Sequence, residues 1–314
     1  MVFVVVRYVL FAYFITMLFD IVNGMEKMPE FLVLDDEIVS LVNELRQHDV
    51  NKLGNGQIIL DYQGHTTTHD STDNARRRLF KWVDPISLEK DTYKKWIALN
   101  NEYEPQVGVP ESNNSKKRKA IDDYLDAVLN TTVWKILYQF LLEKDHLYSR
   151  SFNNFRAWIK QLWFVEYSRK QGLIDSSGFE HVFMGEHNDG EVSGMHSWLR
   201  FYLLERNISQ QFDYRGFTIK RFNIMAAVKF TWRNHIKRTG SFFIGTSPEF
   251  DLALYTLCFL ARQSRNTCKF QLDECPFVIT SYKFIQQGKN FVGTIYPVAG
   301  PLTDKCRQHN FDKY

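Results

Sequence analysis

The segment QQGK, residues 286–289, separates two strand-like stretches, residues 277–285 (FVITSYKFI) and residues 291–296 (FVGTIY). So short a connection with a glycine in it predicts a β-hairpin, and hence an antiparallel sheet. Upstream, residues 217–222 and 228–232 alternate apolar and polar side chains, which is typical of further half-buried strands. The C-terminal part of the chain is therefore predicted to be built on antiparallel sheets.

The N-terminal part shows a different periodicity. Residues 34–45 place Leu34, Ile38, Leu41, Val42 and Leu45 on one helical face. Residues 93–100, 122–142 and 155–163 follow similar patterns, whereas residues 61–74 and 105–120 are polar and predict loops. We therefore predict an α+β fold. A helical part covers residues 31–168, a sheet-containing part covers residues 169–300, and a tail covers residues 301–314.

One helix in the C-terminal part has a strong start signal. Ser247 can cap it, Pro248 suits its first position, and Glu249 and Asp251 favour the positive end of the helix dipole.

The composition excludes a disordered protein. Of 314 residues, 44% are hydrophobic and 15% aromatic, so the chain can bury a large core. A net charge of +3 neither requires nor excludes a nucleic-acid partner.

The N-terminus predicts export. Residues 1–24 combine one early arginine, an uncharged apolar run at 8–19 and small residues near 22–24, which is typical of a cleaved signal peptide. An uncleaved anchor or a buried helix are the alternatives. Secretion is expected, without stable membrane association. A nuclear or cytoplasmic location is the alternative, in which the run KKRK at 116–119 could be a localisation signal; in a secreted protein it is expected to be a solvated loop.

Export makes disulfides plausible. The four cysteines, Cys258, Cys268, Cys275 and Cys306, allow three connectivities, and one or two disulfides are expected. Cys258 lies in an apolar helical run and could instead be a small buried side chain. Asn113, Asn130 and Asn207 begin glycosylation triplets, so the protein is expected to be a glycoprotein.

Two histidines stand out as candidate catalytic groups. His181 and His196 lie fifteen residues apart, with Glu180 and Glu186 beside the first and a turn-forming segment at 187–190 between them. Imidazoles exchange protons near neutral pH. We expect residues 179–185 to be extended, with Glu180 facing away from His181, and the turn to bring His196 close.

Such a pair suits cleavage of RNA by its own 2′-hydroxyl. One group removes the 2′-OH proton, another protonates the departing 5′-oxygen, and a cation such as Lys237 stabilises the charged phosphorane. The products carry 2′,3′-cyclic phosphates, and DNA, which lacks the 2′-OH, is not cut.

Several segments resemble the EndoU family of poly(U)-specific endoribonucleases, which includes placental protein 11. They are GFEHVFMGE at 178–186, GMHSWLRFYL at 194–203, GTSPEF at 245–250 and GTIYP at 293–297, in that order. The resemblance extends from about residue 31 to residue 300. It implies an endoribonuclease that cuts single-stranded RNA at uridines; a secreted RNA-binding protein with little cleavage is the alternative.

The resemblance also assigns roles. It implies that His181, His196, Lys237 and Tyr296 are catalytic, with His196 as base and His181 as acid, and with Lys229 as the fallback for the lysine. It implies that Ser241 and Thr246 read the uracil edge. Animal members typically depend on manganese, so Mn²⁺ is expected at Glu180 and Glu186, outside the chemical step. We expect a monomer.

Overall fold

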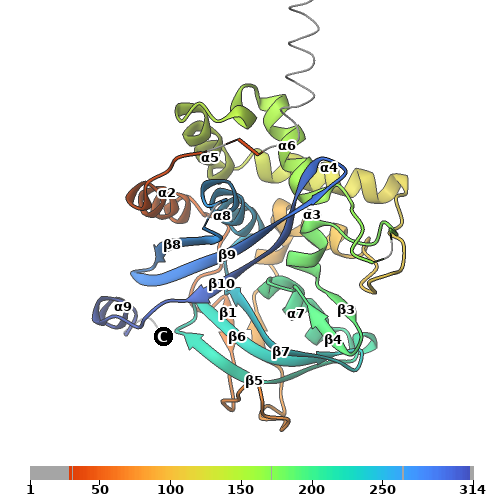
Figure 1. Ribbon diagram of the computed structural model, residues 1–314. Helices are drawn as coiled ribbons and strands as arrows, with labels where there is room; N and C mark the ends of the chain where they lie inside the picture. The colour runs from red at the N-terminus through yellow and green to blue at the C-terminus, as the bar shows by residue number, and fades with distance from the viewer. Residues whose placement is uncertain (1–27, 30, 171, 264, 312–314) are drawn as a thin grey trace, which may run out of the picture.

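The computed structural model describes residues 28–29, 31–170, 172–263 and 265–311 (Figure 1). Helices gather in the N-terminal part and sheets in the C-terminal part, so the predicted α+β fold is confirmed. The predicted signal peptide lies outside the described residues. In the described ranges no helix is both long and apolar enough to cross a membrane.

Five α-helices form most of the N-terminal part. They are α2 (Asp35–Gln47), α3 (Asp91–Asn100), α4 (Ser115–Leu129), α5 (Thr132–Glu143) and α6 (Phe152–Phe164), with 3₁₀ turns η1 (Ser87–Glu89) and η2 (Leu147–Ser149). The apolar stripe predicted for the first helix is largely confirmed. Ile38, Leu41, Val42 and Leu45 are buried, but Leu34 is exposed because it precedes the helix as its N-cap.

Two features of this part differ from the sequence-based prediction. Residues 58–60 (β1, Ile58–Leu60) and 80–83 (β2, Phe80–Val83) pair as a small antiparallel sheet. The run at 116–119 was predicted to be a loop, but it forms the first turn of α4, because the Asn114 side chain caps the helix at the N–H of Lys117. Lys117 is also not solvated. It is buried between Glu111 and Glu166 and forms ion pairs with both.

The predicted hairpin is present. Strands β9 (Cys275–Gln286) and β10 (Lys289–Ala299) pair antiparallel, and β8 (Thr267–Leu272) joins them in a three-stranded sheet. The turn between β9 and β10 is Gln287-Gly288, and both residues have positive φ angles of 50° and 73°. Two such residues match the right-handed twist of a hairpin.

A second sheet has five strands in the order β3 (Glu186–Asn188), β4 (Glu191–Ser193), β7 (His235–Phe243), β6 (Met225–Trp232) and β5 (Phe212–Arg221). The pair β4–β7 is parallel and the other pairs are antiparallel. Helix α7 (Trp198–Arg206), followed by the 3₁₀ turn η4 (Ile208–Gln210), covers one face. Its Phe201 packs edge-on against Phe212 and Phe230. The opposite face of the sheet forms one wall of a pocket.

Helix α8 (Pro248–Ala261) lies between the two parts and contacts α2, α3, α4, α5 and all three strands of the β8–β10 sheet. All fourteen of its residues are buried. The predicted start signal is confirmed, because the Ser247 side chain accepts the Phe250 N–H and Pro248 occupies the first turn.

Two disulfides are formed, where one or two were expected. Cys258 of α8 pairs with Cys268 of β8, and Cys275 of β9 pairs with Cys306 of α9 (Asp304–Asn310). The alternative in which Cys258 is a lone buried thiol is therefore wrong.

Candidate active site

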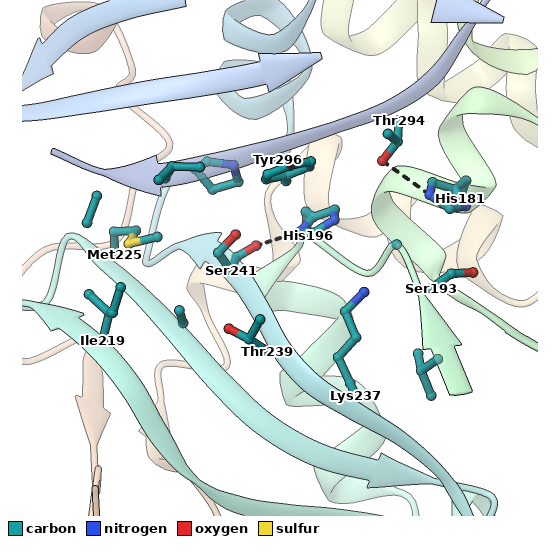
Figure 2. A pocket seen from close by; sticks show the side chains of 16 residues that line it. His181, Ser193, His196, Ile219, Met225, Lys237, Thr239, Ser241, Thr294 and Tyr296 are labelled. Atoms are coloured by element: carbon teal, nitrogen blue, oxygen red, sulfur yellow. Dashed lines mark hydrogen bonds between the residues drawn. The ribbon is translucent and has the colours of Figure 1, made fainter. Parts of the chain in front are cut away.

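A pocket of about 520 Å³ opens between the two sheets (Figure 2). One wall is the face of β5–β7, and the other is the C-terminal end of β10. Its lining residues are His181, Val192, Ser193, Gly194, His196, Ile219, Met225, Ala227, Lys237, Thr239, Ser241, Thr294, Tyr296, Pro297, Val298 and Ala299. The four residues that were predicted to be catalytic all line this one pocket.

His181 lies on a π-helix, η3 (Glu180–Met184), so the prediction of an extended segment is wrong. The wide turn is closed by the Gly185 N–H, which donates to Glu180 O at 2.9 Å. Gly185 then turns the chain into β3 with a φ of 79°, which a residue with a side chain rarely adopts. π-Turns are rare and occur frequently at functional sites.

The hairpin β3–β4 returns the chain to this turn, as the sequence predicted. The Met195 N–H donates to His181 O at 3.0 Å, and the His196 N–H donates to Val182 O at 2.6 Å. A Cβ on Gly194 would lie 1.7 Å from the His181 carbonyl oxygen, so only glycine permits this approach. Backbone contacts thus place both histidines beside the same pocket.

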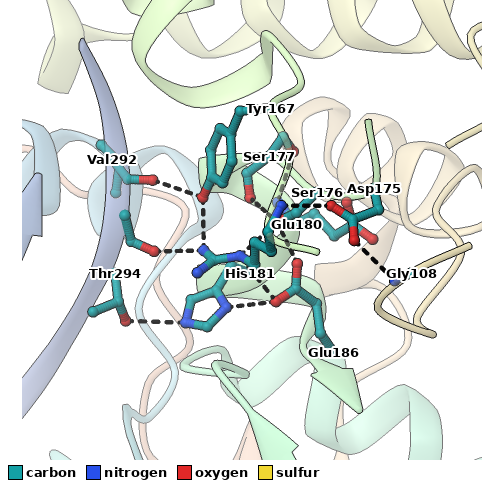
Figure 3. A network of polar contacts seen from close by, with 12 residues as sticks. Gly108, Tyr167, Asp175, Ser176, Ser177, Glu180, His181, Glu186, Val292 and Thr294 are labelled. Carbon is teal, nitrogen blue, oxygen red and sulfur yellow. Dashed lines mark hydrogen bonds and ion pairs between the residues drawn. The ribbon is translucent and has the colours of Figure 1, made fainter. Parts of the chain in front are cut away.

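His181 is held on both ring nitrogens (Figure 3). Its Nδ1 lies 2.6 Å from Glu186 Oε2, and its Nε2 lies 3.2 Å from Thr294 Oγ1. A carboxylate only accepts, so Nδ1 carries a proton. Burial lowers the pKa of His181, and the negative charge of Glu186 opposes that shift.

His196 has a different partner. Its Nδ1 lies 2.8 Å from the backbone carbonyl of Ser241, so Nδ1 must donate and Nε2 of the neutral ring is the acceptor. Burial, with help from the charge of Lys237, holds the pKa of His196 well below its usual range. A neutral imidazole with an unprotonated Nε2 is the form that a general base requires.

Lys237 extends from β7 into the space between His196 and His181 (Figure 2). Burial lowers its pKa from about 10.5 to about 8. The fallback residue, Lys229, is outside the pocket lining, and its ammonium group donates to the carbonyl of Asp70. The geometry therefore favours Lys237 as the lysine of this site.

Tyr296 forms the opposite wall. Its ring lies 5.5 Å from that of His196, at an interplanar angle of 32°. Ser241 lines the pocket below it, but Thr246 does not: it is buried outside the lining, where its carbonyl accepts from Trp198. Thr239 is in the lining instead, two residues before Ser241 on the same face of β7.

Thr294 also lines the pocket, although it was not among the predicted site residues. It precedes Tyr296 by two residues in β10, and alternate strand residues share a face, so the alternation of the strand could have identified it.

The two glutamates, which were predicted to hold manganese, lie in different surroundings beside His181. Glu186 is occupied, since its oxygens contact His181 Nδ1, Ser176 Oγ and, at 3.4 Å, Arg169 Nε. Glu180 is buried, and burial together with the charges of Glu186 and Glu111 raises its pKa well above the usual value, which favours the neutral acid. In the described ranges no three His, Cys, Asp or Glu side chains are placed to hold a metal ion.

Comparisons with known proteins identify the family to which the chain belongs. The family model described as Endoribonuclease XendoU matches residues 37–297. Uridylate-specific endoribonuclease C of Xenopus laevis is 33% identical over 303 residues, covering 91% of this chain and 98% of that protein. Uridylate-specific endoribonuclease B of Danio rerio is 36% identical over 282 residues, covering 84% of this chain and 96% of that protein.

A solved structure of XendoU, described as a splicing-independent snoRNA-processing endoribonuclease, is 32% identical to this chain and superposes with a TM-score of 0.72. The match covers 86% of this chain and 99% of that one. The matched region contains the whole pocket apart from Val298 and Ala299, which lie just beyond the family match. On these grounds the chain belongs to the XendoU family of endoribonucleases and is itself an endoribonuclease.

Proposed function

We propose that the protein cuts single-stranded RNA at uridines, by attack of the 2′-hydroxyl on the adjoining phosphorus, and leaves 2′,3′-cyclic phosphate ends. The observation that carries this proposal is the convergence of His181, His196 and Lys237 on one pocket. Two proton-transfer groups and one cation match the three needs of this reaction.

His196 acts as the base. Its Nδ1 donates to Ser241 O, so the lone pair of Nε2 is available to take the 2′-OH proton. The 2′-oxygen then forms a bond to phosphorus, and the bond from phosphorus to the 5′-oxygen breaks.

His181 acts as the acid. The departing 5′-oxygen needs a proton, and an imidazolium at His181 is stabilised by Glu186 at 2.6 Å. Lys237, charged below a pH of about 8, stabilises the negative charge on the phosphorane oxygens.

Uridine preference is supported by the pocket lining and by the names of the relatives, which are uridylate-specific endoribonucleases. Tyr296 offers a ring face on which a ribose or base can stack, and Ser241 offers a hydroxyl to a base edge. Thr239 lines the pocket and is proposed to contact the uracil edge, the role that was predicted for Thr246.

The test is an assay of the purified protein on an RNA oligonucleotide with one central uridine, with and without Mn²⁺. The controls are the same oligonucleotide with 2′-deoxyuridine at that position and an all-DNA strand. His181→Ala should abolish cutting, while His69→Ala, a change at an exposed histidine outside the pocket, should leave it intact.

Cutting at the uridine with cyclic phosphate ends, lost in the deoxyuridine strand and in His181→Ala, is the expected result. Tight RNA binding without products under any metal condition would instead support the alternative, an RNA-binding protein on this scaffold.

We also propose that the protein is secreted and glycosylated. The two disulfides favour an oxidising compartment, and Asn113, Asn130 and Asn207 are all exposed. Mn²⁺ stays a proposed cofactor, and Glu180 and Glu186 stay its proposed ligands.

A further inference from the structure

Arg169 connects Glu186, the partner of His181, to strand β10. It follows α6 in the segment that leads to the π-helix, and it is not in the pocket lining. Its Nε donates to Ser176 Oγ at 2.9 Å and lies 3.4 Å from Glu186 Oε2. Through these contacts it fixes the carboxylate that orients His181.

The other end of the guanidinium reaches β10. Nη2 donates to the Gly293 carbonyl at 2.6 Å and to the Tyr167 hydroxyl at 2.6 Å. That hydroxyl in turn donates to Val292 O at 3.1 Å (Figure 3). Two adjacent carbonyls of β10 are thus held by one arginine and one tyrosine.

These carbonyls belong to a β-bulge. Val292 pairs with Lys283 and Thr294 pairs with Tyr282, so Gly293 is the extra residue in the strand. Bulges bend a strand and change the direction of the side chains that follow. Here the following side chains are Thr294, which contacts His181 Nε2, and Tyr296, which lines the pocket.

Burial makes these contacts strong. The side chain of Glu186 is 1% exposed and that of Arg169 is 23% exposed, so the charges are poorly screened. A guanidinium can donate in several fixed directions at once, whereas the ammonium of a lysine is a single point charge. Only arginine can therefore span Glu186, Ser176 and Gly293 together.

From this arrangement we infer that Arg169 is a positioning residue for the cleavage reaction. It holds the His181–Glu186 pair against the β-bulge at Gly293. This bulge in turn directs the side chains of Thr294 and Tyr296 into the pocket. The inference rests on the proposed function. It assigns Arg169 no contact with RNA, so its loss should change turnover and not binding.

The test compares Arg169→Gln and Arg169→Lys with the wild-type protein. The matched control is Arg156→Gln. Arg156 is 28% exposed and pairs with Asp122 and Asp126 on the helical part, away from the pocket. Supporting groups of this kind typically contribute about ten- to hundredfold in activity. We expect kcat to fall by about that factor in Arg169→Gln, by less in Arg169→Lys, and not in Arg156→Gln, with KM unchanged.

A second readout separates positioning from general damage. In a crystal structure of Arg169→Gln, Thr294 Oγ1 should move out of hydrogen-bonding distance of His181 Nε2, a contact of 3.2 Å in the wild-type protein, while the helical part stays unchanged. An unchanged kcat, a rise in KM alone, or an equal loss in Arg156→Gln would each overturn the inference. If the wild-type protein cuts no RNA, the proposed function fails, and the crystal structure of Arg169→Gln alone decides this inference: unchanged positions of Thr294 and Tyr296 would refute the positioning role.

Discussion

Replacement of Glu186 by glutamine is the most direct test of the acid–base assignment. The change keeps the size and one accepting oxygen of the side chain but removes the charge that faces His181 Nδ1 at 2.6 Å. The glutamate is 1% exposed, so little solvent compensates for the loss.

The magnitude follows from the hydrogen bond. A bond to a charged group contributes about 1.5–3 kcal/mol and a neutral bond about 0.5–1.5 kcal/mol, so the imidazolium loses about 1–2 kcal/mol of stabilisation. At about 1.4 kcal/mol per tenfold change, kcat should fall by about five- to thirtyfold.

The pH profile should move as well. The charge of Glu186 raises the pKa of His181, so its removal lowers that pKa, and the acid loses its proton at a lower pH. The alkaline limb that belongs to His181 should therefore shift downward.

The assay is kcat against pH on a single-uridine RNA oligonucleotide, with Glu249→Gln as the control. Glu249 is as deeply buried as Glu186 but lies outside the pocket lining. A loss of less than about twofold, with an unmoved profile, would refute the idea that Glu186 supports a charged His181.

Three further predictions concern other residues. Lys237→Met should lower kcat by about a hundredfold or more. In the wild-type protein, kcat should decline as the pH rises through about 8, because Lys237 loses its charge there. Profiles of kcat against pH for the two proteins measure both effects. Lys117→Met should lower the free energy of unfolding in urea by about 3–5 kcal/mol, because it leaves two buried carboxylates without their cation, and a variant in which both carboxylates are also changed to amides should recover part of the loss. Gly194→Ala should abolish cutting while the far-ultraviolet circular dichroism stays the same, because its methyl group would collide with the His181 carbonyl; wild-type activity would contradict this reading of the loop.

Periodicity predicted the elements whose stability comes from burial. The face of α2, the β9–β10 hairpin and the Ser247-Pro248 start of α8 each depend on short-range rules of spacing, turns and capping, and each was found in the structure. The residues that the family resemblance selected for the pocket also converge, with the exception of Thr246.

The missed features depend on contacts between distant segments. The π-turn at His181 is stabilised by backbone contacts from the loop at 194–196, which no local propensity reveals. Lys117 was predicted to be solvated, because runs of charged residues usually are. Its burial depends on an ion pair with Glu166, which lies 49 residues away in the sequence. Arg169 reaches Gly293 across 124 residues, so its role could not be read from neighbouring sequence.

The bulge in β10 has a consequence for the synthesis of the chain. His181 and Thr294, which it brings together, are 113 residues apart, and Tyr296 follows still later. A ribosome adds these residues in order, so an unfinished chain contains both histidines and the lysine for a long period while one wall of the pocket is still unmade. A chain that ends before β10 therefore lacks Thr294 and Tyr296, and its two histidines and lysine then line only part of the pocket.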